Sequence, residues 1–184
     1  LLFDEEGTLI CRTDLPHKQY INEKGWVEHD PEEIYANTLA VVKNLVEKAG
    51  INKNDLAVLG ISNQRETAMV WNRTTGKPVY NAVVWQCARG AQICEEIEKV
   101  GDADMIRSHT GLQLSPYFSA AKIAWVLKNV GGVQELADKG ELCCGTIDSW
   151  LVYKLTGGKE FRTDYSNASR TQMFNISELK WDKQ

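Results

Sequence analysis

The sequence predicts a mixed α/β domain that carries a helical insertion. Three observations support this class: a strongly capped helix follows residue 30, short apolar runs typical of strands lie within residues 56–85, and mostly helical segments continue to residue 155. An order of strands, helix, strands and then mostly helices is typical of a sheet covered by helices. At 184 residues the chain is long enough for one domain and can fold without disulfides or metal.

The first elements are predicted from turn and capping signals. Residues 1–11 form a predicted hairpin around an acidic turn that contains glycine. A helix is predicted to begin after Asp30, which can cap it, because Pro31 suits the first helical position. Glu33 would complete a capping box, and Gly50 ends the helical pattern.

The strands of the predicted sheet follow this helix. The continuous apolar run at residues 56–61 predicts a strand that is buried on both faces, as in parallel sheets. Two further strands are predicted at 68–71 and 82–85, joined by a turn at 74–77. The remaining pattern predicts a short strand at 142–144 and helices at 89–99, 103–109, 119–129, 133–139 and 147–155.

Composition and charge exclude several classes of partner. The net charge is −4 and the basic residues are scattered, which argues against binding to nucleic acid or to an anionic membrane surface. No apolar run approaches the roughly 20 residues of a membrane span. The odd number of cysteines predicts reduced thiols in a cytoplasmic protein; they are Cys11, Cys87, Cys94, Cys143 and Cys144.

Arg65 and Glu66 are the first candidates for chemistry, because they directly follow the apolar run at 56–61. Ligands of open α/β sheets bind beyond the carboxyl ends of strands. A guanidinium that donates beside a carboxylate that accepts can grip neighbouring hydroxyl groups. Taken alone, however, a solvated loop with incidental charges accounts for such a pair more often, since surface ion pairs are common and weak.

Further candidates lie at other predicted element ends. Trp85 could wall a pocket and Tyr117 could offer a hydroxyl, although packing is the commoner role of both residue types. Within the polar stretch 163–171, Asp164 is predicted to cap a turn, and the role of Arg170 stays open. His17, His29 and His109 are far apart and show no metal-ligand spacing, so no metal site is predicted.

Six segments, taken in order, carry a more specific pattern. They are GWVEHDPE (25–32), ISNQRET (61–67), GKPVYNAVVWQ (76–86), PYFS (116–119), GTIDSWL (145–151) and TDYSNASRT (163–171). Together they resemble the glycerol kinases of the carbohydrate-kinase superfamily, which shares the actin-like ATPase (ribonuclease H-like) fold. The similarity runs through nearly the whole chain, so it is more specific than any single motif.

The resemblance implies four glycerol contacts: Arg65 and Glu66 would bind hydroxyl groups, Trp85 would cover carbon, and Tyr117 would add a hydroxyl. It implies that the intact protein transfers the γ-phosphoryl group of ATP, with Mg, to a terminal hydroxyl of glycerol, and that it forms a homo-oligomer. Residues 1–184 would be a partial N-terminal substrate-binding domain, incomplete at both ends. The catalytic aspartate, the phosphate-contacting turn and the ATP-binding domain would lie outside it, so this chain is expected to be inactive alone.

The chain departs from the family pattern beside the implied pocket. Residues 87–90 are Cys-Ala-Arg-Gly where the family often has two adjacent arginines and a threonine, and Ala120-Ala121 replaces a common Gly-Thr. These changes concern local geometry more than substrate class. Two alternatives stay open: a kinase for another polyol or sugar of the superfamily, and a non-catalytic domain for ligand binding or actin-like assembly.

Overall fold

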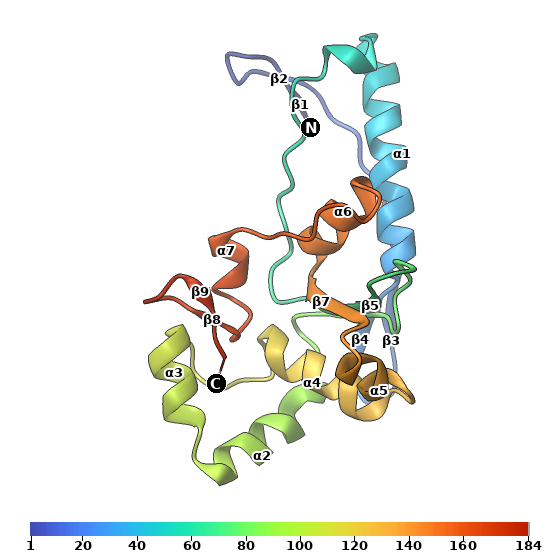
Figure 1. Cartoon of the computed structure of the whole chain (residues 1–184). Helices are drawn as coiled ribbons and strands as arrows, with labels where there is room; N and C mark the ends of the chain where they lie inside the picture. The colour runs from blue at the N-terminus through green and yellow to red at the C-terminus, as the bar shows by residue number, and fades with distance from the viewer. Residues whose placement is uncertain (184) are drawn as a thin grey trace.

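The computed structural model describes residues 1–183, and a five-stranded sheet with the order β3-β4-β6-β5-β7 lies at its centre (Figure 1). The longest pairing joins β5 to β7, with Ala68 opposite Thr146 and Asn72 opposite Leu142. The strands of this sheet are β3 (Gln19–Ile21), β4 (Val27–His29), β5 (Ala68–Asn72), β6 (Ala82–Val83) and β7 (Leu142–Thr146). The α/β class with a helical insertion is therefore confirmed.

The predicted strand at residues 56–61 is wrong. Figure 1 shows this segment as an extended connection that enters the sheet region without strand pairing, and Val58 within it is 86% exposed. A strand requires a neighbour that accepts and donates its backbone hydrogen bonds, and no strand among residues 1–183 lies beside this run. Each strand pair in the described sheet is antiparallel. The apolar run at 56–61 predicted a parallel strand within a mixed sheet.

The helix α1 (Pro31–Ala49) begins and ends as its capping residues predict. Oδ1 of Asp30 accepts the backbone N–H groups of Glu32 and Glu33, at 2.9 and 3.4 Å, and Gly50 ends the helix at φ 66°. The predicted capping box is wrong, because Oε1 of Glu33 accepts the backbone N–H of Lys18 instead, at 3.2 Å. The helix start is thereby attached to the segment that leads into β3.

The two predicted turns are confirmed, and each is organised by one side chain. Oδ1 of Asp4 accepts two backbone N–H groups in the turn that joins β1 (Leu2–Phe3) to β2 (Leu9–Cys11). Oδ1 of Asn72 does the same for Thr74 and Thr75 in the turn after β5. Both turns are therefore specified by neighbouring residues.

Strand β5 divides the interior into two cores. Ala68 and Val70 pack against α4 and α5 on one face of the sheet, whereas Met69 and Trp71 pack against α6 on the other. This alternation follows from the two-residue period of a strand. The helices and short helical turns after β5 are η2 (Ala88–Gly90), α2 (Ala91–Val100), α3 (Ala103–Thr110), α4 (Ser119–Asn129), α5 (Val133–Asp138), α6 (Ile147–Leu155) and α7 (Tyr165–Ala168). A further short turn, η1 (Lys53–Asp55), follows α1.

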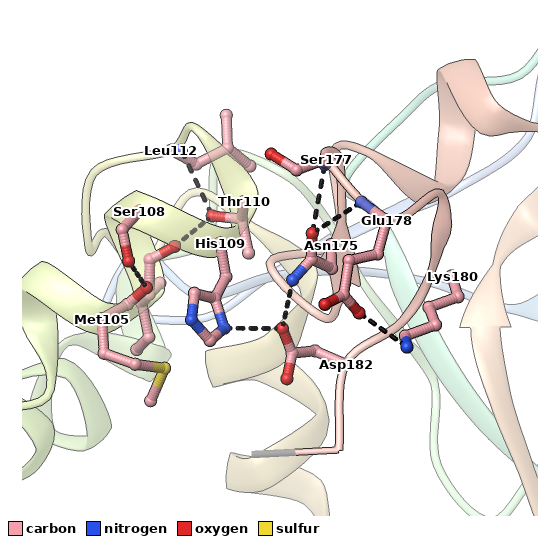
Figure 2. Close-up of polar contacts among 11 residues, drawn as sticks. Met105, Ser108, His109, Thr110, Leu112, Asn175, Ser177, Glu178, Lys180 and Asp182 are labelled. Carbon is pink, nitrogen blue, oxygen red and sulfur yellow. Dashed lines mark hydrogen bonds and ion pairs between the residues drawn. The ribbon is translucent and has the colours of Figure 1, made fainter.

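The C-terminal hairpin, β8 (Phe174–Asn175) with β9 (Lys180–Trp181), is attached to α3. Figure 2 shows the contact: Nδ1 of His109 and Oδ2 of Asp182 lie 2.8 Å apart, and Nδ2 of Asn175 donates to the same oxygen at 3.2 Å. The backbone N–H of Ile176 also donates to the carbonyl of His109, at 3.0 Å. The segment that follows α7 is thus tied to the helical insertion.

The five cysteines form no disulfide with one another, in agreement with the predicted free thiols. Among the helices of residues 1–183, none combines the length and apolar character that crossing a bilayer requires.

Candidate functional site

The candidate site begins at the turn that carries Arg65 and Glu66, directly before β5. Glu66 has a φ of 65°, in the left-handed region that a residue with a side chain seldom adopts, and it is 4% exposed. Arg65 is exposed, although it is adjacent in the sequence. Unusual backbone at a loop of this kind is often found where side chains must be aimed at a ligand.

The buried Glu66 carboxylate is held from the far end of the chain. Nε of Arg170 donates to its Oε1 at 2.6 Å, and Oγ of Ser119 donates to the Glu66 backbone carbonyl at 3.2 Å. No described residue donates to the other carboxylate oxygen, Oε2. Glu66 therefore has one carboxylate oxygen that accepts no hydrogen bond from the described residues.

The structure changes the interpretation of the Arg65–Glu66 pair. The ion-pair partner of Glu66 is Arg170, and the Arg65 guanidinium makes no hydrogen bond or ion pair with the residues described.

Asp164 caps the short α7 by accepting the N–H of Asn167 at 2.8 Å, as predicted. The polar stretch 163–171, which contains Asp164 and Arg170, indicated a possible site. Its residue spacing could not show that Arg170 pairs with Glu66.

Trp85 and Tyr117 meet beside this turn. Their ring centroids are 5.7 Å apart in an edge-to-face arrangement, which is a favourable geometry for aromatic pairs. The backbone N–H of Trp85 donates to Oγ1 of Thr67 at 3.3 Å, one residue after Glu66. Tyr117 is 38% exposed and Trp85 is half-buried, so both rings can contact a ligand from outside. We name Glu66, Trp85 and Tyr117 the substrate cluster, after the role that is proposed for them below.

Two cations that the sequence did not assign lie under the substrate cluster. The Arg170 guanidinium is 4.9 Å from the ring centroid of Phe118, the residue after Tyr117. The Nζ atom of Lys122 donates to the backbone carbonyls of residues 116, 117 and 118. Lys122 is fully buried, and this burial lowers the pKa of its ammonium to about 8. In the sequence Lys122 looked like an ordinary position of the helix at 119–129, so periodicity gave no signal.

Two residues of the segment 87–90, Arg89 and Gly90, have packing roles. Nη2 of Arg89 lies 2.7 Å from Oε1 of Glu28, and the Arg89 guanidinium is 4.7 Å from the ring centroid of Trp26. Burial disfavours ionisation of Glu28, but hydrogen bonds led by that of Tyr80, together with Arg89, hold its pKa below the usual value. Gly90, beside it, packs closely against α4. Arg89 is therefore occupied in the interior.

A cavity of about 730 Å³ lies elsewhere in the domain, and its lining includes none of Arg65, Glu66, Trp85 and Tyr117. It is bounded by β7, the start of α6, the segment around α7 and the hairpin β8–β9. Within residues 1–183, no three or more His, Cys, Asp or Glu side chains are grouped so that they could hold a metal ion.

The whole chain, residues 1–184, matches the model of the N-terminal domain of the FGGY family of carbohydrate kinases. It is 53% identical over 184 residues to glycerol kinase 1 of Thermotoga maritima and 54% identical to the glycerol kinase of Thermoanaerobacter pseudethanolicus. Each alignment covers 100% of this chain and 37% of the relative. The chain thus spans little more than a third of the length of these relatives.

Solved structures give the same result for the fold. The crystal structure of Plasmodium falciparum glycerol kinase with ADP matches with a TM-score of 0.89 and 36% identity, over 98% of this chain and 36% of that one. Gluconate kinase from Lactobacillus acidophilus matches with a TM-score of 0.83 at 21% identity, over 98% of this chain and 35% of that one, which supports the actin-like ATPase fold alone. The chain belongs to the FGGY family of carbohydrate kinases, whose N-terminal domain it matches over its full length.

Proposed function

We propose that the intact protein phosphorylates glycerol with ATP, and that residues 1–184 supply most of the glycerol pocket as part of an N-terminal substrate-binding domain. The identity of about half of all residues to two glycerol kinases over the full chain supports this substrate class. The proposal for the whole protein extends beyond the 37% of those relatives that the chain spans.

One observation supports the assignment of the pocket: the turn that carries two charged residues is joined by a hydrogen bond to one of a pair of partly exposed aromatic residues. Oε2 of Glu66 and the guanidinium of Arg65 have no partner among the described residues. Trp85 and Tyr117 pack edge to face, and the backbone N–H of Trp85 donates to Thr67, the residue after Glu66. A polyol needs this combination, because each hydroxyl both donates and accepts whereas the carbon chain is apolar.

Each of the four residues has a separate role in this proposal. Arg65 donates to glycerol hydroxyls, and Glu66 accepts from one through Oε2. The Trp85 ring covers the carbon chain, and the Tyr117 hydroxyl adds a further hydrogen bond. Together they would hold the terminal hydroxyl in one orientation, and positioning contributes much of the rate of phosphoryl transfer.

ATP and Mg are not assigned to residues of this chain. The described residues provide no cluster of acidic side chains for a divalent cation. The sequence also contains no P-loop pattern, although kinases of other folds hold phosphates without one. We place the nucleotide site, the metal and the general base in the part of the intact protein that lies outside residues 1–184.

Two further properties of the intact protein are proposed more briefly. The five free thiols support a reducing, cytoplasmic compartment. The homo-oligomer implied by the family resemblance is a prediction that light scattering on the full-length protein would check.

The test of the proposed function is a substrate panel with the full-length protein. ADP release is measured with Mg-ATP and, in turn, glycerol, other short polyols, gluconate and xylulose. We expect the highest kcat/KM with glycerol. A higher value with another compound would move the assignment to a different kinase of the family, and glycerol binding without turnover with any compound would support a non-catalytic role.

A further inference from the structure

Lys122 is buried at a position where an apolar side chain would cost less. It lies in the first turn of α4, and none of its surface is exposed. A charge away from water is costly unless it is fully hydrogen-bonded. Its burial is therefore expected to serve a purpose that a methionine or leucine would not.

The hydrogen bonds of Lys122 identify that purpose. An ammonium group has three N–H donors, and Nζ of Lys122 meets three consecutive backbone carbonyls, those of Pro116, Tyr117 and Phe118. The distances to the first and third are 2.8 and 3.0 Å. These carbonyls belong to the loop before α4 and to the helix N-cap, Phe118. One side chain thus binds this segment at three successive points.

The loop that Lys122 binds carries one member of the substrate cluster. Tyr117 is 38% exposed, and its ring meets those of Trp85 and Phe118. Nζ of Lys122 lies 6.0 Å from the centroid of the Tyr117 ring. Because no covering element fixes Tyr117 from outside, the direction of its hydroxyl depends on the backbone conformation of residues 116–118.

We propose that Lys122 is a positioning residue for the substrate: it fixes the backbone of residues 116–118 so that Tyr117 presents its hydroxyl beside Trp85. This inference rests on the proposed function, since it assumes that Tyr117 binds a polyol. Lys122 does not touch the ligand itself, because its donors are occupied by carbonyl groups.

The test uses the full-length enzyme with three substitutions. Lys122→Met removes the donors at similar length, Lys122→Arg keeps charge and donors, and Lys128→Met changes an exposed lysine of the same helix that pairs with Glu96. We expect Lys122→Met to raise KM for glycerol on the order of ten-fold, the effect of one lost hydrogen bond, with smaller changes in kcat and in KM for ATP. Lys122→Arg should recover part of the loss, and Lys128→Met should resemble wild type.

A double-mutant cycle separates positioning from general stabilisation. If Lys122 acts through Tyr117, adding Lys122→Met to Tyr117→Phe should raise KM for glycerol by less than it does alone, since the same hydroxyl contact is lost. Additive effects, or a Lys122→Met variant with lowered thermal stability but unchanged KM, would overturn the inference.

A measurement on the wild-type enzyme covers the case in which the variants do not fold. Burial lowers the pKa of Lys122 to about 8, against Cys87, Glu66 and Cys94, the ionisable groups that favour its charge. Loss of one N–H above that pH should weaken glycerol binding several-fold, as measured by calorimetry from pH 7 to 9.5. A constant affinity over this range would contradict the proposal.

The substrate panel with the wild-type enzyme shows whether the proposed function fails, independently of the Lys122 variants. If wild type turns over a different polyol, that compound replaces glycerol in the same cycle. If it turns over none, the proposed function fails, and the affinity for glycerol measured by calorimetry still compares Lys122→Met with wild type.

Discussion

Arg170 and Glu66 are 104 residues apart in the sequence, yet Nε of Arg170 donates to Oε1 of Glu66 at 2.6 Å. The Glu66 side chain is 5% exposed and the Arg170 side chain 28%. Arg170 also lies over the ring of Phe118. One arginine therefore connects the turn before β5 with the loop before α4, the two segments that carry Glu66 and Tyr117.

Arg170→Ala is expected to destabilise the protein and to weaken glycerol binding. It leaves the buried Glu66 carboxylate without its charged partner, which costs about 1–3 kcal/mol or more. Urea unfolding of the purified chain and KM for glycerol of the full-length enzyme are the two measurements. Arg12→Ala is the control, since the Arg12–Asp14 pair is exposed and should contribute little. Equal unfolding midpoints for the two variants would show that the Arg170–Glu66 pair is not important.

Arg65→Ala should reduce kcat/KM for glycerol with little effect on stability. A charged donor to a ligand hydroxyl is worth about 1.5–3 kcal/mol, so losing one or two such bonds lowers kcat/KM by between about ten-fold and about 10⁴-fold. KM for ATP should change little. Arg162→Ala, on another exposed arginine, provides the comparison. Near wild-type kcat/KM in Arg65→Ala would remove Arg65 from the pocket.

The free energy of unfolding should depend on pH through the protonation of His29. Its ring is 2% exposed, Nδ1 lies 3.3 Å from Nε2 of His17, and burial, together with the charge of His17, lowers the pKa of His29 to about 4. Between pH 6.5 and 4 the unfolded chain binds a proton that the folded chain does not, so stability falls as pH falls. The contribution is complete above pH 6.5, and up to about 3 kcal/mol is lost by pH 4.

Urea unfolding of the chain at several pH values from 7 to 4 measures this loss. His29→Gln removes the titrating group, so its stability should fall less steeply over the same interval. Carboxylates add their own acid dependence to both proteins, and the difference between the two curves isolates His29. Parallel curves would mean that His29 does not contribute.

Gly90 is expected to tolerate no side chain. A Cβ at Gly90 would lie 2.9 Å from the Cβ of Ala121 and 3.2 Å from its carbonyl carbon, so α4 would have to move. Gly90→Ala should therefore destabilise the chain by about 1–3 kcal/mol. Gly131→Ala is a matched control, because nothing lies within 4 Å of a Cβ there. Thermal unfolding measures the Tm of both variants, and equal Tm values would contradict the close packing at Gly90.

The 184-residue chain by itself is predicted to show no glycerol-dependent ADP release. Phosphoryl transfer needs an oriented hydroxyl, bound Mg-ATP and a base, and the proposed function places only the first within these residues. A coupled assay of the purified chain, with and without glycerol, measures this. Glycerol-dependent turnover of roughly 1–100 per second, as in an intact kinase, would place the whole active site within residues 1–184.

Elements with local signals could be predicted from the sequence closely. Helix α1 follows from Asp30 and Gly50, and the helices 119–129 and 147–155 have the predicted bounds. Local signals could not predict the structure of residues 56–61 correctly. An apolar run favours extended backbone, but it does not show whether a partner strand lies beside it. Strand order and the capping partner of Glu33 are likewise non-local.

The sequence by itself determined the family and most of the helices, because these depend on residue types in order along the chain. The four pocket residues that the resemblance implies stay a prediction. Tertiary structure alone decided that Arg170 rather than Arg65 pairs with Glu66, and that Lys122 is buried beneath Tyr117. The physical reason is that an ion pair or a buried ammonium depends on which groups fold together. Arg170 and Glu66 are 104 residues apart, and no local pattern predicts their contact. The contact forms only when the domain packs.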